Sequence, residues 1–126
     1  MGVQSESRTI LVVEDNANIR RSYEELLKDA GYSVLSAASG QQARAFATRQ
    51  PVAAVLLNDH LSDTTGVELC REFRTHLALT IPIIVLTADR TPTLAEAATT
   101  SGATALLHKP IDPYDLLTLL AAYRLR

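Results

Sequence analysis

The chain has 126 residues, which is enough for one domain built around one hydrophobic core. A formal net charge of -2 gives no basic surface for direct nucleic-acid binding, and no apolar run reaches the roughly 20 residues of a membrane span. Cys70 is the only cysteine, which excludes an internal disulfide and a cysteine metal cluster and favours a reducing cytoplasm.

Residues 1–8 lack the apolar stretch of a signal peptide and are expected to form a disordered leader. Residues 9–126 are expected to form one folded domain, because strand and helix patterns alternate through them. The first strand is predicted at 9–14, where the apolar run is continuous, as in a strand buried on both faces. A helix is predicted at 16–30, and Gly31 supplies its stop.

The rest of the chain continues the alternation of strands and helices. Later strands are predicted at residues 32–37, 53–58, 82–87 and 103–108. Later helices are predicted at residues 39–49, 65–75, 91–101 and 112–124, and two of them open on a capping box. Two starts remain open for the fourth helix. It begins either at Thr91, with Pro92 in its first turn, or at Thr93, with Glu96 closing a capping box.

A strand followed by a helix, repeated along the chain, predicts an α/β fold with parallel strands joined by right-handed crossovers. We expect a flavodoxin-like, doubly wound, five-stranded sheet in the order 2-1-3-4-5, with helices on both faces. Such sheets bind ligands beyond the carboxyl ends of their strands, at the point where the strand order reverses. That point lies between the first and third strands, so Glu14, Asp15 and Asn58 are expected to be neighbours.

Polar residues follow four of the predicted strands: Glu14 and Asp15, then Asn58, then Thr87, then Lys109. Carboxylates are the ligands that magnesium prefers, and a lysine ammonium suits a phosphoryl oxygen. Each residue also has an ordinary explanation, since paired acids occur in turns, lysines lie on surfaces and threonine is common in strands. Their shared position at the strand ends favours a site for magnesium and a phosphoryl group.

The segments ILVVEDN, LLNDHLSDTTG, IVLTA and HKP, in this order, resemble the receiver domain of two-component response regulators from about Thr9 to Tyr123. The resemblance implies an acidic pair that binds magnesium, matched by Glu14 and Asp15. It also implies a hydroxyl and a lysine that contact the phosphoryl group, matched by Thr87 and Lys109. A histidine kinase or phosphotransfer protein is the implied partner.

Further implications concern the main chain and the surface. The resemblance implies that the backbone carbonyl of His60 is a metal ligand and that the Lys109-Pro110 peptide bond is cis. It also implies an output surface on the fourth helix, fifth strand and fifth helix, which would contact an effector domain or a second copy of the chain. Asp63 matches an acid common in the family's loop, and we expect it to be a turn residue.

The phospho-acceptor position departs from the family pattern. Leu61 and Gly66 fix the register, which places Asn58 where the family has an aspartate. An amide cannot form an acyl phosphate, so we expect no phosphorylation there and weaker magnesium binding. Lys109 is expected to bond to the Asn58 oxygen or to an acid. Asp59 remains a less favoured substitute acceptor, because neighbouring strand residues point to opposite faces.

Leu106 is a second departure, since the family usually has Tyr or Phe three residues before the lysine. Either the aromatic part of the usual switch is absent, or Leu106 is an ordinary strand residue.

The leading hypothesis is a receiver in phosphorelay signalling that is not phosphorylated at Asn58; the alternative is a phosphorylation-independent docking module. An enzyme with an aspartyl nucleophile is disfavoured, because Glu14-Asp15-Asn16 is not the Asp-x-Asp pattern of such phosphatases. A single-domain regulator and a receiver within a longer protein both remain open.

Overall fold

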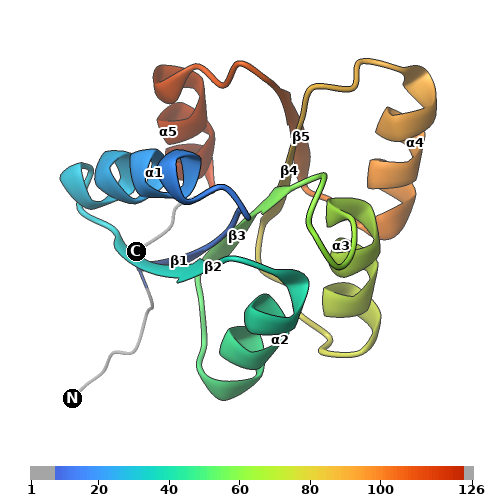
Figure 1. Ribbon diagram of the computed structural model, residues 1–126, viewed down its shortest axis with the longest axis horizontal. Helices are drawn as coiled ribbons and strands as arrows, with labels where there is room; N and C mark the ends of the chain where they lie inside the picture. The colour runs from blue at the N-terminus through green and yellow to red at the C-terminus, as the bar shows by residue number, and fades with distance from the viewer. Residues whose placement is uncertain (1–7, 124–126) are drawn as a thin grey trace.

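The computed structural model describes residues 8–123, which fold into alternating strands and helices (Figure 1). The strands are β1 Thr9–Val13, β2 Ser33–Ala37, β3 Ala54–Asn58, β4 Ile83–Thr87 and β5 Ala105–His108. The helices are α1 Ala17–Asp29, α2 Gly40–Arg49, α3 Gly66–Thr75, α4 Pro92–Ser101 and α5 Pro113–Ala122. Within this range no helix has the length and apolar character needed to cross a membrane.

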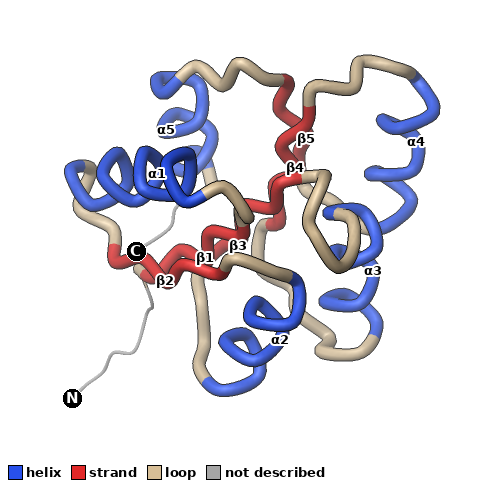
Figure 2. The backbone as a smooth tube through the Cα atoms, in the orientation of Figure 1, coloured by secondary structure: helices blue, strands red, loops and turns tan. Residues whose placement is uncertain are grey.

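The strands form a single parallel sheet in the order β2-β1-β3-β4-β5, which confirms the predicted flavodoxin-like fold. Figure 2 shows the strands side by side through the middle of the molecule. Helices α1 and α5 cover one face, and α2, α3 and α4 lie on the other (Figure 1). Since all strands run the same way, their carboxyl ends meet at one edge of the sheet.

Alternate residues of each central strand pack into two separate cores. In β1, Leu11 and Val13 belong to the core under α2 and α3, whereas Ile10 and Val12 belong to the core under α1 and α5. All four side chains are buried. The uninterrupted apolar run in the sequence therefore reflects a strand with a helical layer on each side.

Side-chain caps set the helix starts, as the sequence indicates. The hydroxyl of Ser39 accepts a hydrogen bond from Gln42 N at 3.1 Å, and the hydroxyl of Thr65 accepts one from Glu68 N at 3.1 Å. The start of α4 is settled in favour of Thr91, whose hydroxyl accepts from Leu94 N at 3.2 Å.

The predicted boundaries agree with the structure to within one residue, except at the start of β5 and at the two ends of the predicted domain. Strand β5 begins at Ala105 rather than at residue 103. The hydroxyl of Thr104 accepts a hydrogen bond from Ile83 N at 2.9 Å, so a side chain takes the place of a main-chain partner there. Helix α5 ends at Ala122, and the predicted end near Arg124 lies outside the described residues. The predicted leader also lies outside them except for Arg8, whose guanidinium lies 4.8 Å from the centre of the Tyr32 ring.

Gly66 brings the start of α3 against the end of β3. Its amide donates to Asp59 O at 2.7 Å, and a Cβ placed on it would lie 2.8 Å from Asn58 O and 3.0 Å from Asp59 Cα. These neighbours are backbone atoms, which cannot rotate away. Only glycine therefore allows the loop after β3 to fold back so tightly.

The substitution Gly66→Ala is expected to lower the free energy of unfolding by about 1–3 kcal/mol, the usual cost of forcing extra atoms into a packed site. Chemical denaturation measures the change. Gln41→Ala, at an exposed position in the first turn of α2, is the control and should change stability by less than about 0.5 kcal/mol. Equal stability of Gly66→Ala and the native chain would show that this loop is loosely held.

Candidate functional site

Asn58 lies at the centre of the polar cluster at the strand ends. Its side chain is buried, and its Oδ1 accepts a hydrogen bond from Lys109 Nζ. Its Nδ2 donates to His60 O at 2.6 Å and, over a longer 3.5 Å, to Glu14 Oε2. One amide thus connects the ends of β1, β3 and β5. Of the two partners predicted for Lys109, the Asn58 oxygen or an acid, the hydrogen bond is to the Asn58 oxygen.

Glu14 follows β1 directly and is 2% exposed. Its Oε2 accepts from Asn16 N at 3.0 Å, whereas its buried Oε1 has no hydrogen-bond partner among the described residues. Lys109 Nζ lies 3.9 Å from that oxygen. Burial raises the pKa of Glu14, assisted by Asp15, while the Asn16 hydrogen bond and the Lys109 charge act in the opposite direction.

Oxygen donors suited to a hard cation converge here. Glu14 Oε1 is a buried carboxylate oxygen without a hydrogen-bond partner in the described part of the chain, and the exposed carboxyl of Asp15 follows it in the sequence. The remaining predicted donors, Asn58 Oδ1 and His60 O, already accept hydrogen bonds from Lys109 and from the Asn58 amide. The donor set fits magnesium in kind, but two of its oxygens are engaged within the protein.

The hydroxyl of Thr87 contacts a different residue from those the sequence indicates. The sequence predicts Thr87 with Asn58 and Lys109, but its Oγ1 donates to Asp59 Oδ2 at 3.3 Å. It also accepts from Asp89 N at 3.0 Å. Thr87 and Asp59 are both buried, and sequence reasoning missed this contact. Strand alternation offers no signal for it, because Asp59 lies just beyond the last residue of β3.

Asp63 does more than the turn role predicted for it. Its two carboxylate oxygens accept from Gly40 N at 2.8 Å and Gln41 N at 3.0 Å. These bonds lower the pKa of Asp63 and join the loop after β3 to the start of α2. The available signal was an acid that could meet the positive end of a helix, but the sequence alone does not say which helix.

The predicted output surface is only partly free. In α5, Leu116 and Leu120 are buried, and Leu117 and Leu119 pack partly against the same core, so most of the leucines of this helix already contact the core. Tyr114 is 75% exposed at the start of that helix. On β5, Leu106 is half-buried and pairs with Val85 in the ladder with β4.

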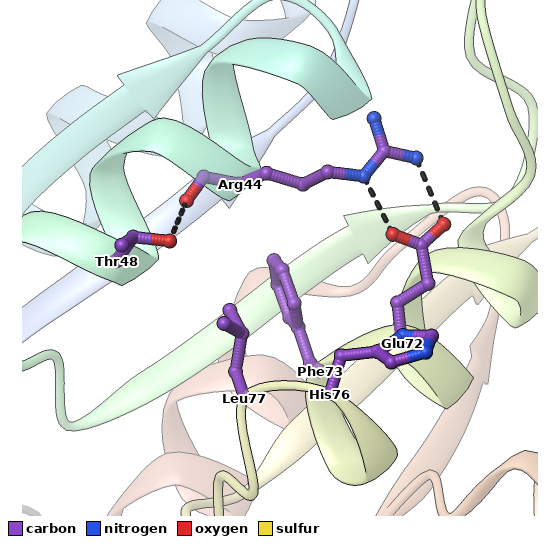
Figure 3. Close-up of a pocket in the computed structure, with 6 residues that line it drawn as sticks. All are labelled: Arg44, Thr48, Glu72, Phe73, His76 and Leu77. Carbon is purple, nitrogen blue, oxygen red and sulfur yellow. Dashed lines mark hydrogen bonds and ion pairs between the residues drawn. The ribbon is translucent and has the colours of Figure 1, made fainter.

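A cavity of about 280 Å³ lies between α2 and α3, away from the strand ends (Figure 3). It is lined by Arg44, Thr48, Glu72, Phe73, His76 and Leu77. Arg44 and Glu72 form a two-point ion pair across it, with Nε–Oε2 at 2.6 Å and Nη2–Oε1 at 2.9 Å. None of the residues that line it belongs to the polar cluster around Asn58 at the strand ends.

Comparison with known proteins gives a consistent family assignment. The model of the response regulator receiver domain matches residues 10–121. The phosphate regulon transcriptional regulatory protein PhoB of Pseudomonas aeruginosa is 37% identical over 116 residues, covering 91% of this chain and 51% of that protein. The chain therefore spans about half the length of this relative.

Two solved structures extend the comparison. The chemotaxis protein CheY4 of Vibrio cholerae superposes with a TM-score of 0.87 at 30% identity, over 94% of this chain and 99% of that one. The receiver domain of the sensor histidine kinase PA1611 of P. aeruginosa, with magnesium coordinated in its active-site cleft, has a TM-score of 0.81 at 32% identity, over 93% and 97%. By sequence and by fold, the chain belongs to the family of response regulator receiver domains of two-component signalling.

Proposed function

We propose that this receiver domain carries Asn58 at the phospho-acceptor position and so takes part in two-component signalling without being phosphorylated there. The hydrogen bond from Lys109 to the Asn58 amide oxygen carries the proposal. Lysine suits a phosphoryl oxygen, and here its partner is the side chain that ends β3. Glu14 and His60 O complete the surroundings of that side chain.

The chemistry of the amide supports an unphosphorylated state. A carboxylate oxygen carries the charge and lone pairs needed to attack phosphorus, whereas the Asn58 oxygen is neutral and its nitrogen donates to His60 O. The neighbouring groups satisfy both ends of the amide. The Asn58 side chain is therefore fully hydrogen-bonded without a phosphoryl group.

We propose weakened magnesium binding as a second consequence. Magnesium, when bound, would neutralise charge on phosphoryl oxygens. Glu14 and Asp15 would hold it, but His60 O would first have to give up the Asn58 amide. An aspartate at position 58 would add about 8 kcal/mol of gross attraction to a divalent ion 4 Å away at an effective dielectric of 20, much of it offset by solvent.

The proposed partners follow from the family. A histidine kinase or phosphotransfer protein would dock near the strand ends, and the surface of α4, β5 and α5 would contact an effector domain or a second copy. PhoB is a transcriptional regulator of about twice the matched length, and PA1611 is a sensor kinase that contains a receiver domain. Among relatives, a receiver domain therefore occurs both in a transcriptional regulator and in a sensor kinase. We propose that the chain acts in the cytoplasm as a switch or adaptor rather than as an enzyme.

A phosphorylation-independent docking module is the second candidate function. The bonded state of Asn58 favours it, since the amide holds Lys109 and His60 O without any ligand. In that case the domain would present one fixed surface to its partner. The two candidates differ in whether the rest of the pocket can still carry out the family's chemistry.

Incubation with magnesium and a small phosphodonor, followed by intact mass measurement, separates these candidates. We expect the native chain to remain unmodified and Asn58→Asp to gain one phosphoryl group, because only the nucleophile is missing. The double variant Asn58→Asp/Asp59→Asn is the control and should gain the same group. A phosphoryl group on the native chain would refute the assignment of Asn58, and an unmodified Asn58→Asp would favour the docking module.

Calorimetric titration tests the proposed effect on magnesium. Asn58→Asp is expected to tighten magnesium binding by roughly tenfold or more, because a third negative charge joins Glu14 and Asp15. Asp29→Asn, which removes an exposed acid at the end of α1, should leave the affinity unchanged. Equal affinities for the native chain and Asn58→Asp would place the metal elsewhere.

The raised pKa of Glu14 gives a pH-dependent prediction. Its charged form is disfavoured in the fold, so the free energy of unfolding should fall as pH rises through the folded-state pKa, above the ordinary 4.5. Glu14→Gln should therefore be more stable than the native chain near pH 7, and the difference should vanish below the ordinary pKa. Thermal melts of the native chain and of Glu14→Gln in metal-free buffer, at several pH values, measure this difference in stability. A difference that stays constant across pH would contradict the prediction.

A further inference from the structure

Asp59 is a buried carboxylate whose direction is set by its own main chain. Its amide donates to Leu86 O at 2.9 Å, and its carbonyl accepts from Gly66 N at 2.7 Å. The missing side chain of Gly66 allows this approach, since a Cβ there would lie 3.0 Å from Asp59 Cα. Asp59 is 5% exposed. Its carboxylate is therefore held beside β4 rather than free to turn into solvent.

The hydroxyl of Thr87 is committed to this carboxylate. A hydroxyl has one proton to donate, and Thr87 donates it to Asp59 Oδ2 at 3.3 Å. No hydrogen bond joins that hydroxyl to the side chains of Asn58 or Lys109, all of which lie in the described part of the chain. Thr87 therefore cannot donate to an oxygen beside Lys109 while it bonds to Asp59.

Burial makes this hydrogen bond costly to break. A carboxylate inside a protein is unfavourable unless hydrogen bonds satisfy it. The other polar side chain near Asp59 Oδ2 is His60, whose Nε2 lies 3.9 Å away on a side chain that is 88% exposed, so its contribution is weak. Thr87 is thus the main side-chain donor that the structure gives to this carboxylate.

The contact continues to the start of α4. Thr87 Oγ1 accepts from Asp89 N at 3.0 Å, and Asp89 Oδ1 accepts from Thr91 N at 2.8 Å. Thr91 in turn caps α4. A chain of hydrogen bonds therefore runs from Asp59 through the loop after β4 to the first turn of the helix.

We propose that Asp59 is a positioning residue that fixes the Thr87 hydroxyl away from Asn58 and Lys109, and so holds the loop after β4 in one arrangement without a phosphoryl group. This rests on the proposed function, in which Asn58 stays unphosphorylated; by the family resemblance, Thr87 is the hydroxyl that would contact a phosphoryl group on an aspartate at position 58. The side chain of Asp59 supplies an acceptor for this hydroxyl inside the fold. The domain would then present a constant surface at the start of α4.

Three-bond NMR couplings to the Thr87 methyl carbon report its side-chain rotamer and test the proposal. In the native chain we expect a single rotamer, with the hydroxyl toward Asp59. Asp59→Ala removes the acceptor and should populate a second rotamer, because only the hydrogen bond from Asp89 N then holds the Thr87 oxygen. Asp59→Asn keeps an acceptor oxygen without the charge and should retain most of the single-rotamer pattern. Asp29→Ala removes a distant acid and should change nothing.

Two results would overturn the proposal: averaged couplings at Thr87 in the native chain, or an unchanged single rotamer in a folded Asp59→Ala variant. If Asp59→Ala does not fold, the native spectrum still decides, because a fixed rotamer toward Asp59 supports the proposal and averaging contradicts it. The measurement uses neither magnesium nor a phosphodonor. Averaged couplings at Thr87 would therefore leave the assignment of Asn58 unchanged. Phosphorylation of the native chain would refute that assignment but would leave the Thr87 rotamer result valid.

Discussion

The hydrogen bond between Lys109 and the Asn58 amide oxygen joins the ends of β3 and β5, and the rest of the strand-end cluster is arranged around it. The amide nitrogen extends the connection to His60 O and toward Glu14. A carboxylate at this position would add charge to a pocket that already contains buried Glu14. The amide instead accepts a hydrogen bond from Lys109 while adding no repulsion, so Asn58 and Lys109 are paired without a ligand.

The sequence predicts this convergence well because the physics of a parallel sheet determines it. The continuous apolar run of residues 10–13 indicates a strand covered on both faces, and the two cores confirm it. Parallel strands then bring Glu14, Asn58 and Lys109 to one edge, whatever their separation in sequence. Local signals were equally sufficient for helix starts such as Thr65, where the cap involves only neighbouring residues.

The contacts of Asp59 and Asp63 could not be predicted, because both depend on how one loop folds back against the rest of the domain. Alternation along a strand says where a side chain points only while the strand continues, and β3 ends at Asn58. Beyond that residue Gly66 determines the path, by a close backbone approach that sequence patterns do not reveal. The cap that Asp63 places on α2 likewise joins residues more than twenty positions apart, and no short-range rule identifies such a pair.

The side-chain amide resonances of Asn58 test the central claim most directly, which is that this amide is held between Lys109 and His60 O in the native chain. We expect two distinct amide protons that exchange slowly with solvent, and we expect their shifts to move when Lys109→Met removes the ammonium. Rapid exchange, together with shifts that Lys109→Met leaves unchanged, would contradict the account. It would mean that Asn58 is not the partner of the lysine at the strand ends.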